Sequence, residues 1–229
     1  MSIGKMRGLL VLTVVMIALM TVMGVWQLSR AEQKRQLQRE WDSRSQIELG
    51  LGEALAVDAP FGHRLRVSGV YLAGGDLFLD NQIDEGRVGY RLVRPLQTAA
   101  GLLAVDIGWI QADADRSRLP VVSWPGDDSV ELTGFIVRPY LPPLSLASHR
   151  QDPLPARVQS LQPELLARHW GEPVLPFILK TVEGTVLESG WQPVVMGPER
   201  HTGYAIQWFA MALAVLIAGL IFYRRWHEA

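Results

Sequence analysis

The side chains that could do chemistry gather near the C-terminal end of the sequence, where one histidine precedes two aromatic residues. His201, Tyr204 and Trp208 lie at positions i, i+3 and i+7, so a helix would present all three on one face. An imidazole beside two aromatic rings could ligate the iron of a flat, lipophilic porphyrin. It could equally hydrogen-bond lipid headgroups, with the two rings forming an interfacial aromatic belt. The spacing alone leaves both interpretations open.

A nearby glutamine and the rest of the sequence add little catalytic chemistry. Gln207 lies on another face of this helix, where we expect it to contact a neighbouring helix. There is no G-x-S-x-G, P-loop or H-E-x-x-H motif, and the 5 histidines show no short ligand spacing. The absence of cysteine excludes disulfides and cysteine-ligated zinc. Acidic side chains outnumber basic ones over residues 31–200, which argues against nucleic acid binding. We expect no enzyme and no nucleic-acid partner.

Two apolar segments must position these residues. In a chain of 229 residues, residues 8–29 and 202–223 contain no charged side chain. Each would form about 33 Å of helix, enough to cross a hydrocarbon core of about 30 Å. The sequence therefore predicts a membrane protein with transmembrane helices over 8–29 and 202–223. The first segment could be a signal peptide, but no small-x-small cleavage site follows it cleanly, so we expect it to be retained as an anchor.

The segment between the two anchors reads as a mostly β, α+β extramembrane domain over residues 30–200. A charged helical stalk is expected over residues 30–44, because the segment is rich in Arg, Gln, Glu and Lys and has no Gly or Pro. Alternating or apolar runs predict strands, which lie at 63–72, 77–79, 90–95, 102–110, 130–137 and 177–182. We expect the first two to form a hairpin, and the whole to be an antiparallel sheet or a small open barrel. Ser160 is expected to cap a short helix that has Pro163 in its first turn.

Charge does not settle the orientation of the two anchors. Two spans place both termini on one side of the membrane. Several cations follow the first span, and a simple positive-inside count would place the domain in the cytoplasm. That rule applies to short loops, whereas long domains translocate largely regardless of charge.

Five motifs in order resemble one known family. They are Gly24-x-Trp26-Gln27-Leu28-x-Arg30 with Lys34, Gly69-x-Tyr71, Gly86-x-x-Gly89-Tyr90-Arg-Leu-x-x-Pro95-Leu, Gly108-Trp109-Ile110, and His201-x-x-Tyr204-Ala-x-x-Trp208-Phe209. Each motif alone is weak, but the order and the two-span architecture are specific. The sequence resembles the Surfeit-locus protein one family, which comprises cytochrome c oxidase assembly factors.

The resemblance implies a protein of the bacterial inner membrane with both termini in the cytoplasm and the central domain in the periplasm. It implies assistance with haem a binding and insertion into cytochrome c oxidase subunit I, with haem a received from haem a synthase. His201 matches the family's candidate ligand for the haem iron, and Tyr204 and Trp208 match the same cofactor-binding motif. The alternative is a membrane scaffold without a cofactor, whose domain holds oxidase assembly intermediates.

The sequence departs from the family at the edges of two motifs. Asp106-Ile107 stands where the family usually has Asn-Arg, so an expected positive charge is missing next to Gly108. An asparagine-rich approach to His201 is also missing. Arg30, Lys34 and Arg200 are alternative cations near the same membrane surface, where they could contact haem propionates.

Overall fold

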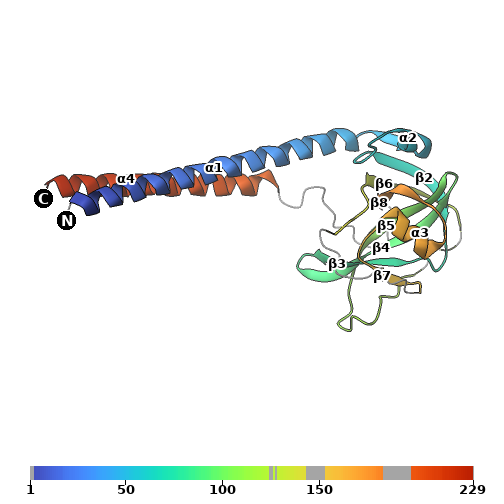
Figure 1. Ribbon diagram of the computed structural model, residues 1–229. Coiled ribbons are helices and arrows are strands. Elements are labelled where there is room, and N and C mark those ends of the chain that lie inside the picture. Colours follow the sequence, from blue (N-terminus) through green and yellow to red (C-terminus); the bar gives the residue numbers. More distant parts are fainter. Residues whose placement is uncertain (1–2, 124–125, 127, 143–152, 183–196, 229) are drawn as a thin grey trace. The chain divides into compact units, whose positions relative to one another are not determined.

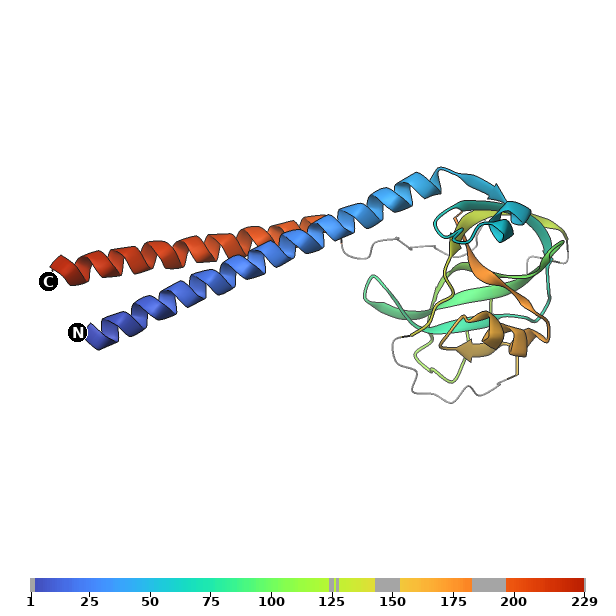
Figure 2. The same ribbon diagram turned by 45° about the horizontal axis from the view of Figure 1, so that its top comes forward.

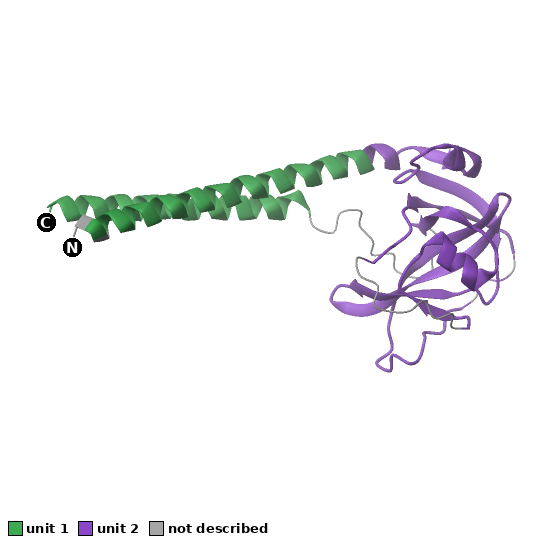
Figure 3. Ribbon diagram, in the orientation of Figure 1, with its two compact units in different colours: residues 1–41, 192–229 green, residues 42–191 purple. Residues whose placement is uncertain are grey.

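The structure is a computed structural model that describes residues 3–123, 126, 128–142, 153–182 and 197–228 (Figure 1). The chain divides into two compact units, residues 1–41 with 192–229, and residues 42–191 (Figure 3). The elements in chain order are α1 (Ile3–Ser45), β1 (Glu48–Gly50), α2 (Leu51–Ala56), β2 (Arg64–Tyr71), β3 (Leu77–Asp84), β4 (Arg87–Thr98), β5 (Gly101–Gln111), β6 (Val130–Val137), β7 (Ala156–Val158), α3 (Pro163–Trp170), β8 (Val174–Thr181) and α4 (Pro198–Glu228).

The first unit consists of two long helices. α1 contains the first apolar segment and continues without a break through the expected stalk, and α4 contains the second apolar segment. Both helices are long and apolar enough to cross a membrane, and only 6% and 11% of their most apolar windows are buried. The core helix of a soluble protein would be mostly buried, so these exposed apolar surfaces indicate membrane association. Stalk residues 30–41 group with these helices, although the sequence assigned them to the extramembrane domain.

The second unit is built on a closed β-barrel. The strands β2, β6, β8, β5 and β4 are paired in that order, and a further pairing between β2 and β4 closes the ring. β3 and β7 extend the sheet beyond β4, while β1 lies beside β2. The second unit contains all the strands that the sequence predicted, with β3 outside the ring, but the short β1 and β7 and the helix α2 were not predicted.

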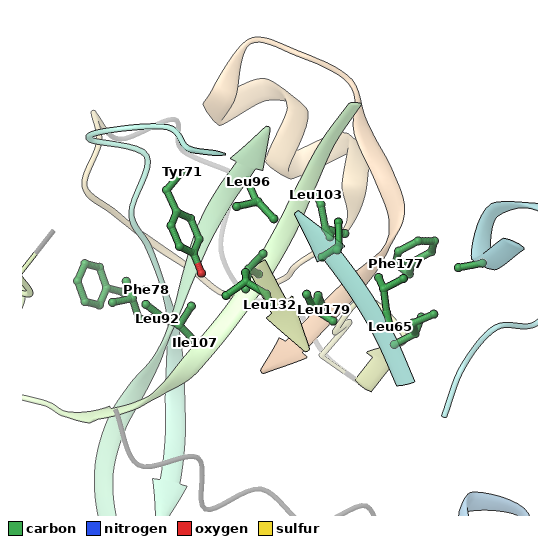
Figure 4. Packing of buried hydrophobic residues seen from close by; sticks show 14 of the residues in the cluster. Leu65, Tyr71, Phe78, Leu92, Leu96, Leu103, Ile107, Leu132, Phe177 and Leu179 are labelled. Carbon is green, nitrogen blue, oxygen red and sulfur yellow. The ribbon is translucent and has the colours of Figure 1, made fainter. Parts of the chain in front are cut away.

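The barrel strands follow from the hydrophobic pattern of the sequence. Alternate side chains of the strands point inward and form one core, shown in Figure 4 for residues such as Leu65, Tyr71, Leu103 and Leu179. A second cluster on the other face of β3, β4, β5 and β8 is covered by β7 and α3. β4 and β5 are buried on both faces; β5 is apolar over most of its length, whereas β4 also buries Arg91 and Arg94.

The expected hairpin between residues 63–72 and 77–79 is wrong. β2 and β3 do not pair with each other; both pair with the same neighbour, β4, in antiparallel register. β2 reaches only the end of β4, at Leu96 and Gln97, whereas β3 pairs with β4 from Arg87 to Val93. β4 is long enough to accommodate both strands one after the other, so the turn between them redirects the chain instead of folding it back.

The expectations of a purely antiparallel sheet and of an open barrel are also wrong. β8 pairs with β5 in parallel and with β6 in antiparallel register, so the long connection after β6 returns the chain between these two strands. That connection includes α3, which starts with Pro163 as predicted and ends at Gly171 in the left-handed conformation (φ 78°). The N-cap is Gln162. Ser160 instead donates its hydroxyl hydrogen to the Tyr140 carbonyl (3.1 Å).

A buried charge cluster joins the three central strands. Asp106 of β5 accepts hydrogen bonds on Oδ2 from Arg91 Nε of β4 (2.5 Å) and from Lys180 Nζ of β8 (2.8 Å). All three side chains are buried. Burial lowers the pKa of Lys180 to about 8; Asp106 opposes this effect and Arg91 adds to it.

Removing the carboxylate of this cluster should destabilise the barrel. In Asp106→Asn, Arg91 and Lys180 stay buried without their counter-charge, and the free energy of unfolding should fall by about 3–5 kcal/mol. Chemical denaturation of the full chain in detergent, followed by near-UV circular dichroism, measures this change. The control is Glu85→Ala, which removes the exposed Arg87–Glu85 ion pair (3.6 Å) and should cost less than about 1 kcal/mol. Equal effects of the two variants would contradict the role of the cluster.

The lowered pKa of Lys180 predicts a pH dependence of stability. Between pH 8 and 10.5 the unfolded chain holds the Lys180 proton more often than the folded chain, so the lysine's contribution to stability rises with pH. The free energy of unfolding of the wild type should therefore improve relative to Lys180→Met across this window. Parallel denaturation curves from pH 7 to 10.5 provide the measurement. A constant difference between the two proteins would show that the folded pKa is not lowered.

Candidate functional site

Small residues bring α1 and α4 into contact. On α4 they recur every seven positions, at Ala205, Ala212 and Gly219, and both alanines are buried. On α1, Gly24 is covered by the ring of Phe209 from α4, and an added Cβ at Gly24 would lie only 2.6 Å from a ring carbon. Small residues on helices in an apolar environment make room for side chains of the facing helix in this way. The glycine of the first motif is therefore needed for helix packing.

The contacts place the two helices in antiparallel register. Gly24 meets Phe209, and Thr13 meets Gly219 farther along the pair. Figures 1 and 2 show the same arrangement, with the first turn of α1 and the last turn of α4 at one end. Trp26 and Trp208 therefore lie at nearly the same level, as expected for an aromatic belt.

The candidate ligand His201 is hydrogen-bonded across the helix pair. Its Nδ1 lies 2.8 Å from Oε1 of Gln27 on α1, and both side chains are half-buried. An amide oxygen only accepts hydrogen bonds, so with this assignment Nδ1 carries the ring proton. No residue that the structure describes hydrogen-bonds Nε2. The neutral ring thus has its Nε2 lone pair available, and this is the form of histidine that ligates a metal.

A second polar contact joins the helices beside this histidine. Arg35 on α1 donates to the hydroxyl of Thr202 (3.2 Å), and Thr202 donates to the Pro198 carbonyl (3.0 Å). Arg35 also forms an exposed ion pair with Glu32 (3.3 Å). Two hydrogen bonds, made by His201 and by Thr202, therefore join the helices at the polar end of the pair. Small residues lie at the contacts in its apolar part.

The three residues singled out in the sequence share α4 but differ in exposure. His201 and Trp208 are half-buried, whereas 49% of Tyr204 is exposed. Gln207 is exposed and makes no hydrogen bond with the described residues of α1, and the polar contact between the helices at this end comes from Gln27. Their roles as cofactor-binding residues stay predictions.

The sequence did not single out two residues near the site, Gln27 and Arg35. The cation that contacts α4 also differs from the cations that the sequence suggested. Gln27 was visible as part of a motif; an uncharged polar side chain in an apolar helix is costly alone and so predicts a polar partner. Arg35 had no such signal. Among the alternative cations, Arg30 lies over the Trp26 ring (5.5 Å) and donates to Gln33 (3.0 Å). Arg35 is the cation that reaches α4.

The two central motifs of the barrel pack against each other. The Trp109 ring lies over Gly89, where a Cβ would come within 2.5 Å of ring carbons. The Trp109 indole donates to the Gln82 carbonyl (3.0 Å), and Arg87 lies 5.2 Å from the ring centroid. Gly86 forms the β3–β4 turn with a φ of 79°. These motifs therefore serve turn geometry and core packing in the second unit.

The fold and site define a class of protein: a β-barrel domain in one chain with a pair of apolar helices that carries one half-buried histidine at its polar end. A family model described as the SURF1 family matches residues 14–213, which include most of both helices and the whole barrel. The chain belongs to the SURF1 family, the Surfeit-locus protein one family that the motifs resemble. This family is associated with cytochrome c oxidase assembly. No curated protein matches the chain.

The helix register can be tested by cross-linking, because the chain has no cysteine of its own. A Cβ at Gly219 would lie 4.0 Å from the Cβ of Thr13, a separation that suits a disulfide. The double variant Thr13→Cys, Gly219→Cys should therefore oxidise readily, as measured by maleimide labelling before and after reduction. The control is Val14→Cys with Gly219→Cys, because 65% of Val14 is exposed. Equal oxidation of both pairs would contradict the register.

Proposed function

We propose that this protein is a membrane-anchored assembly factor that holds haem a and delivers it to cytochrome c oxidase subunit I. His201 is the proposed ligand of the haem iron, and Tyr204 and Trp208 offer aromatic surfaces beside it on α4. The observation that carries the proposal is the hydrogen bond from His201 Nδ1 to Gln27, which leaves Nε2 with a free lone pair. Membership of a family associated with oxidase assembly supports the same function.

The residues present fit this cofactor. A neutral imidazole is a common axial ligand of haem iron, and the apolar segment of α4, as suits a lipophilic porphyrin, begins directly after His201. When bound, haem a would supply the redox-active iron that the oxidase requires. Arg35 and Arg30 lie outside the apolar segment of α1 and could pair with propionate groups, as cations commonly do with carboxylates.

The helix pair suits transfer better than permanent storage. α4 has one other histidine, His227, which is roughly 39 Å away along the helix at 1.5 Å per residue, so it cannot ligate the same iron. A single protein ligand leaves the cofactor exchangeable, because release governs how fast a complex turns over. His201 therefore orients the cofactor at the edge of the helix pair, where a partner protein can approach it.

The proposed location is the bacterial inner membrane, with both termini in the cytoplasm and the barrel in the periplasm. The antiparallel helix pair supports two spans, since its ends lie at the same level. In this arrangement haem a synthase would supply the cofactor within the bilayer, and oxidase subunit I would accept it there. The second candidate, a scaffold without cofactor, gains support from the barrel's size and not from any feature of the helix pair.

The haem proposal predicts a spectroscopic difference. The wild type and His201→Ala are purified from cells that make haem a, and their absorption spectra are compared at equal protein concentration. Loss of the iron ligand should lower the haem a content of His201→Ala by at least about tenfold. His227→Ala is the matched control, because it removes a histidine from the opposite end of α4, and it should retain the wild-type content.

Two results would contradict the proposal. Equal haem a content in the wild type and His201→Ala would remove His201 as ligand. Co-purification of oxidase subunits with no porphyrin absorption in any preparation would favour the scaffold instead.

A further inference from the structure

The geometry points to Gln27 as the positioning residue that fixes the ring proton of His201 on Nδ1 and directs Nε2 outward as a ligand. The part of this inference that concerns the proton stands on the structure of the helix pair alone. The part that concerns haem a rests on the function proposed above.

The two side chains are matched in chemistry and in level. Gln27 lies three positions before Arg30, close to the end of the apolar segment of α1, and His201 stands directly before the apolar segment of α4. Their heavy atoms are 2.8 Å apart, a normal hydrogen-bond distance, although 174 positions separate them in sequence. Both side chains are half-buried, so water satisfies neither of them completely.

An uncharged partner gives a particular form of histidine. A carboxylate in the position of Gln27 would favour the imidazolium, which has no lone pair to offer a metal. The amide oxygen of Gln27 accepts a hydrogen bond from the neutral ring and adds no charge beside it. The ring is therefore held in the tautomer and the orientation in which Nε2 can bind iron.

Partners of this kind have a measurable effect in metal proteins. A metal-ligating histidine almost always donates its other ring N–H to a protein group, and loss of that group typically weakens metal binding 10–100-fold. A residue that only holds helices together would have no such effect on the ring proton. The state of the ring thus separates positioning from simple helix packing.

The test uses the full chain in lipid nanodiscs, labelled with ¹⁵N-histidine, without haem and at a pH where the ring is neutral. The His201 signals are assigned by their loss in His201→Ala. In the wild type, Nδ1 should give the protonated, pyrrole-type signal and Nε2 the pyridine-type signal. Gln27→Leu, which removes the acceptor oxygen, should lose this preference.

Gln207→Leu is the matched control, because it removes an exposed glutamine at the same end of the helix pair. It should leave the ring signals unchanged. The Thr13–Gly219 cross-link, introduced into each variant, reports whether the helices still pair. A wild type protonated on Nε2, or unchanged signals in Gln27→Leu with the helices paired, would overturn the inference.

Haem a titration then tests the second part. Gln27→Leu should bind haem a about 10–100-fold more weakly than the wild type. Equal affinity of the wild type and Gln27→Leu would overturn the positioning role. If no protein binds haem a while the ring signals change as expected, the proposed function fails and the assignment of the proton stands.

Discussion

The antiparallel register of α1 and α4 is the constraint on which the site depends. Because Gly24 receives the Phe209 ring and Thr13 meets Gly219, the apolar segments of the two helices span the same levels. Their charged flanks are therefore aligned at both ends, as two helices in one bilayer require. A shift of one helical turn, about 5.4 Å, would separate His201 from Gln27 and leave two half-buried polar groups unpaired.

The two units satisfy buried polar groups in different ways. In the barrel, the Asp106 carboxylate forms ion pairs with two buried cations, and its Oδ1 accepts a hydrogen bond from the Gly108 N–H (3.2 Å). In the helix pair, an imidazole is matched by an uncharged amide. Ion pairs are costly in an apolar environment, and they would also fix the histidine in its charged form. The neutral pairing is the one that preserves a metal ligand.

Local patterns in the sequence predicted the elements well but their pairing poorly. Charge-free segments predicted both long helices, and alternation predicted the barrel strands, because both signals arise within one element. The partners of β3 and β8 are chosen by chain segments far away, so the expected hairpin and antiparallel sheet were wrong. For the site, spacing grouped His201 with Tyr204 and Trp208. The hydrogen bond to Gln27 joins the two ends of the chain, and only the packing of Gly24 against Phe209 sets their register.

The difference from the usual family pattern at Asp106 can be explained by the neighbours of this residue in the barrel, without reference to the helix pair. An arginine two residues before Trp109 would place a cation on β5, but here the cations come from Arg91 and Lys180 on the neighbouring strands, and Asp106 binds both. The negative charge of Asp106 is thus balanced within the sheet. Because all three side chains are buried, the cluster contributes to the stability of the barrel and offers no exposed charge to an anionic group. On the helix pair, by contrast, the partly exposed Arg35 contacts α4 next to His201.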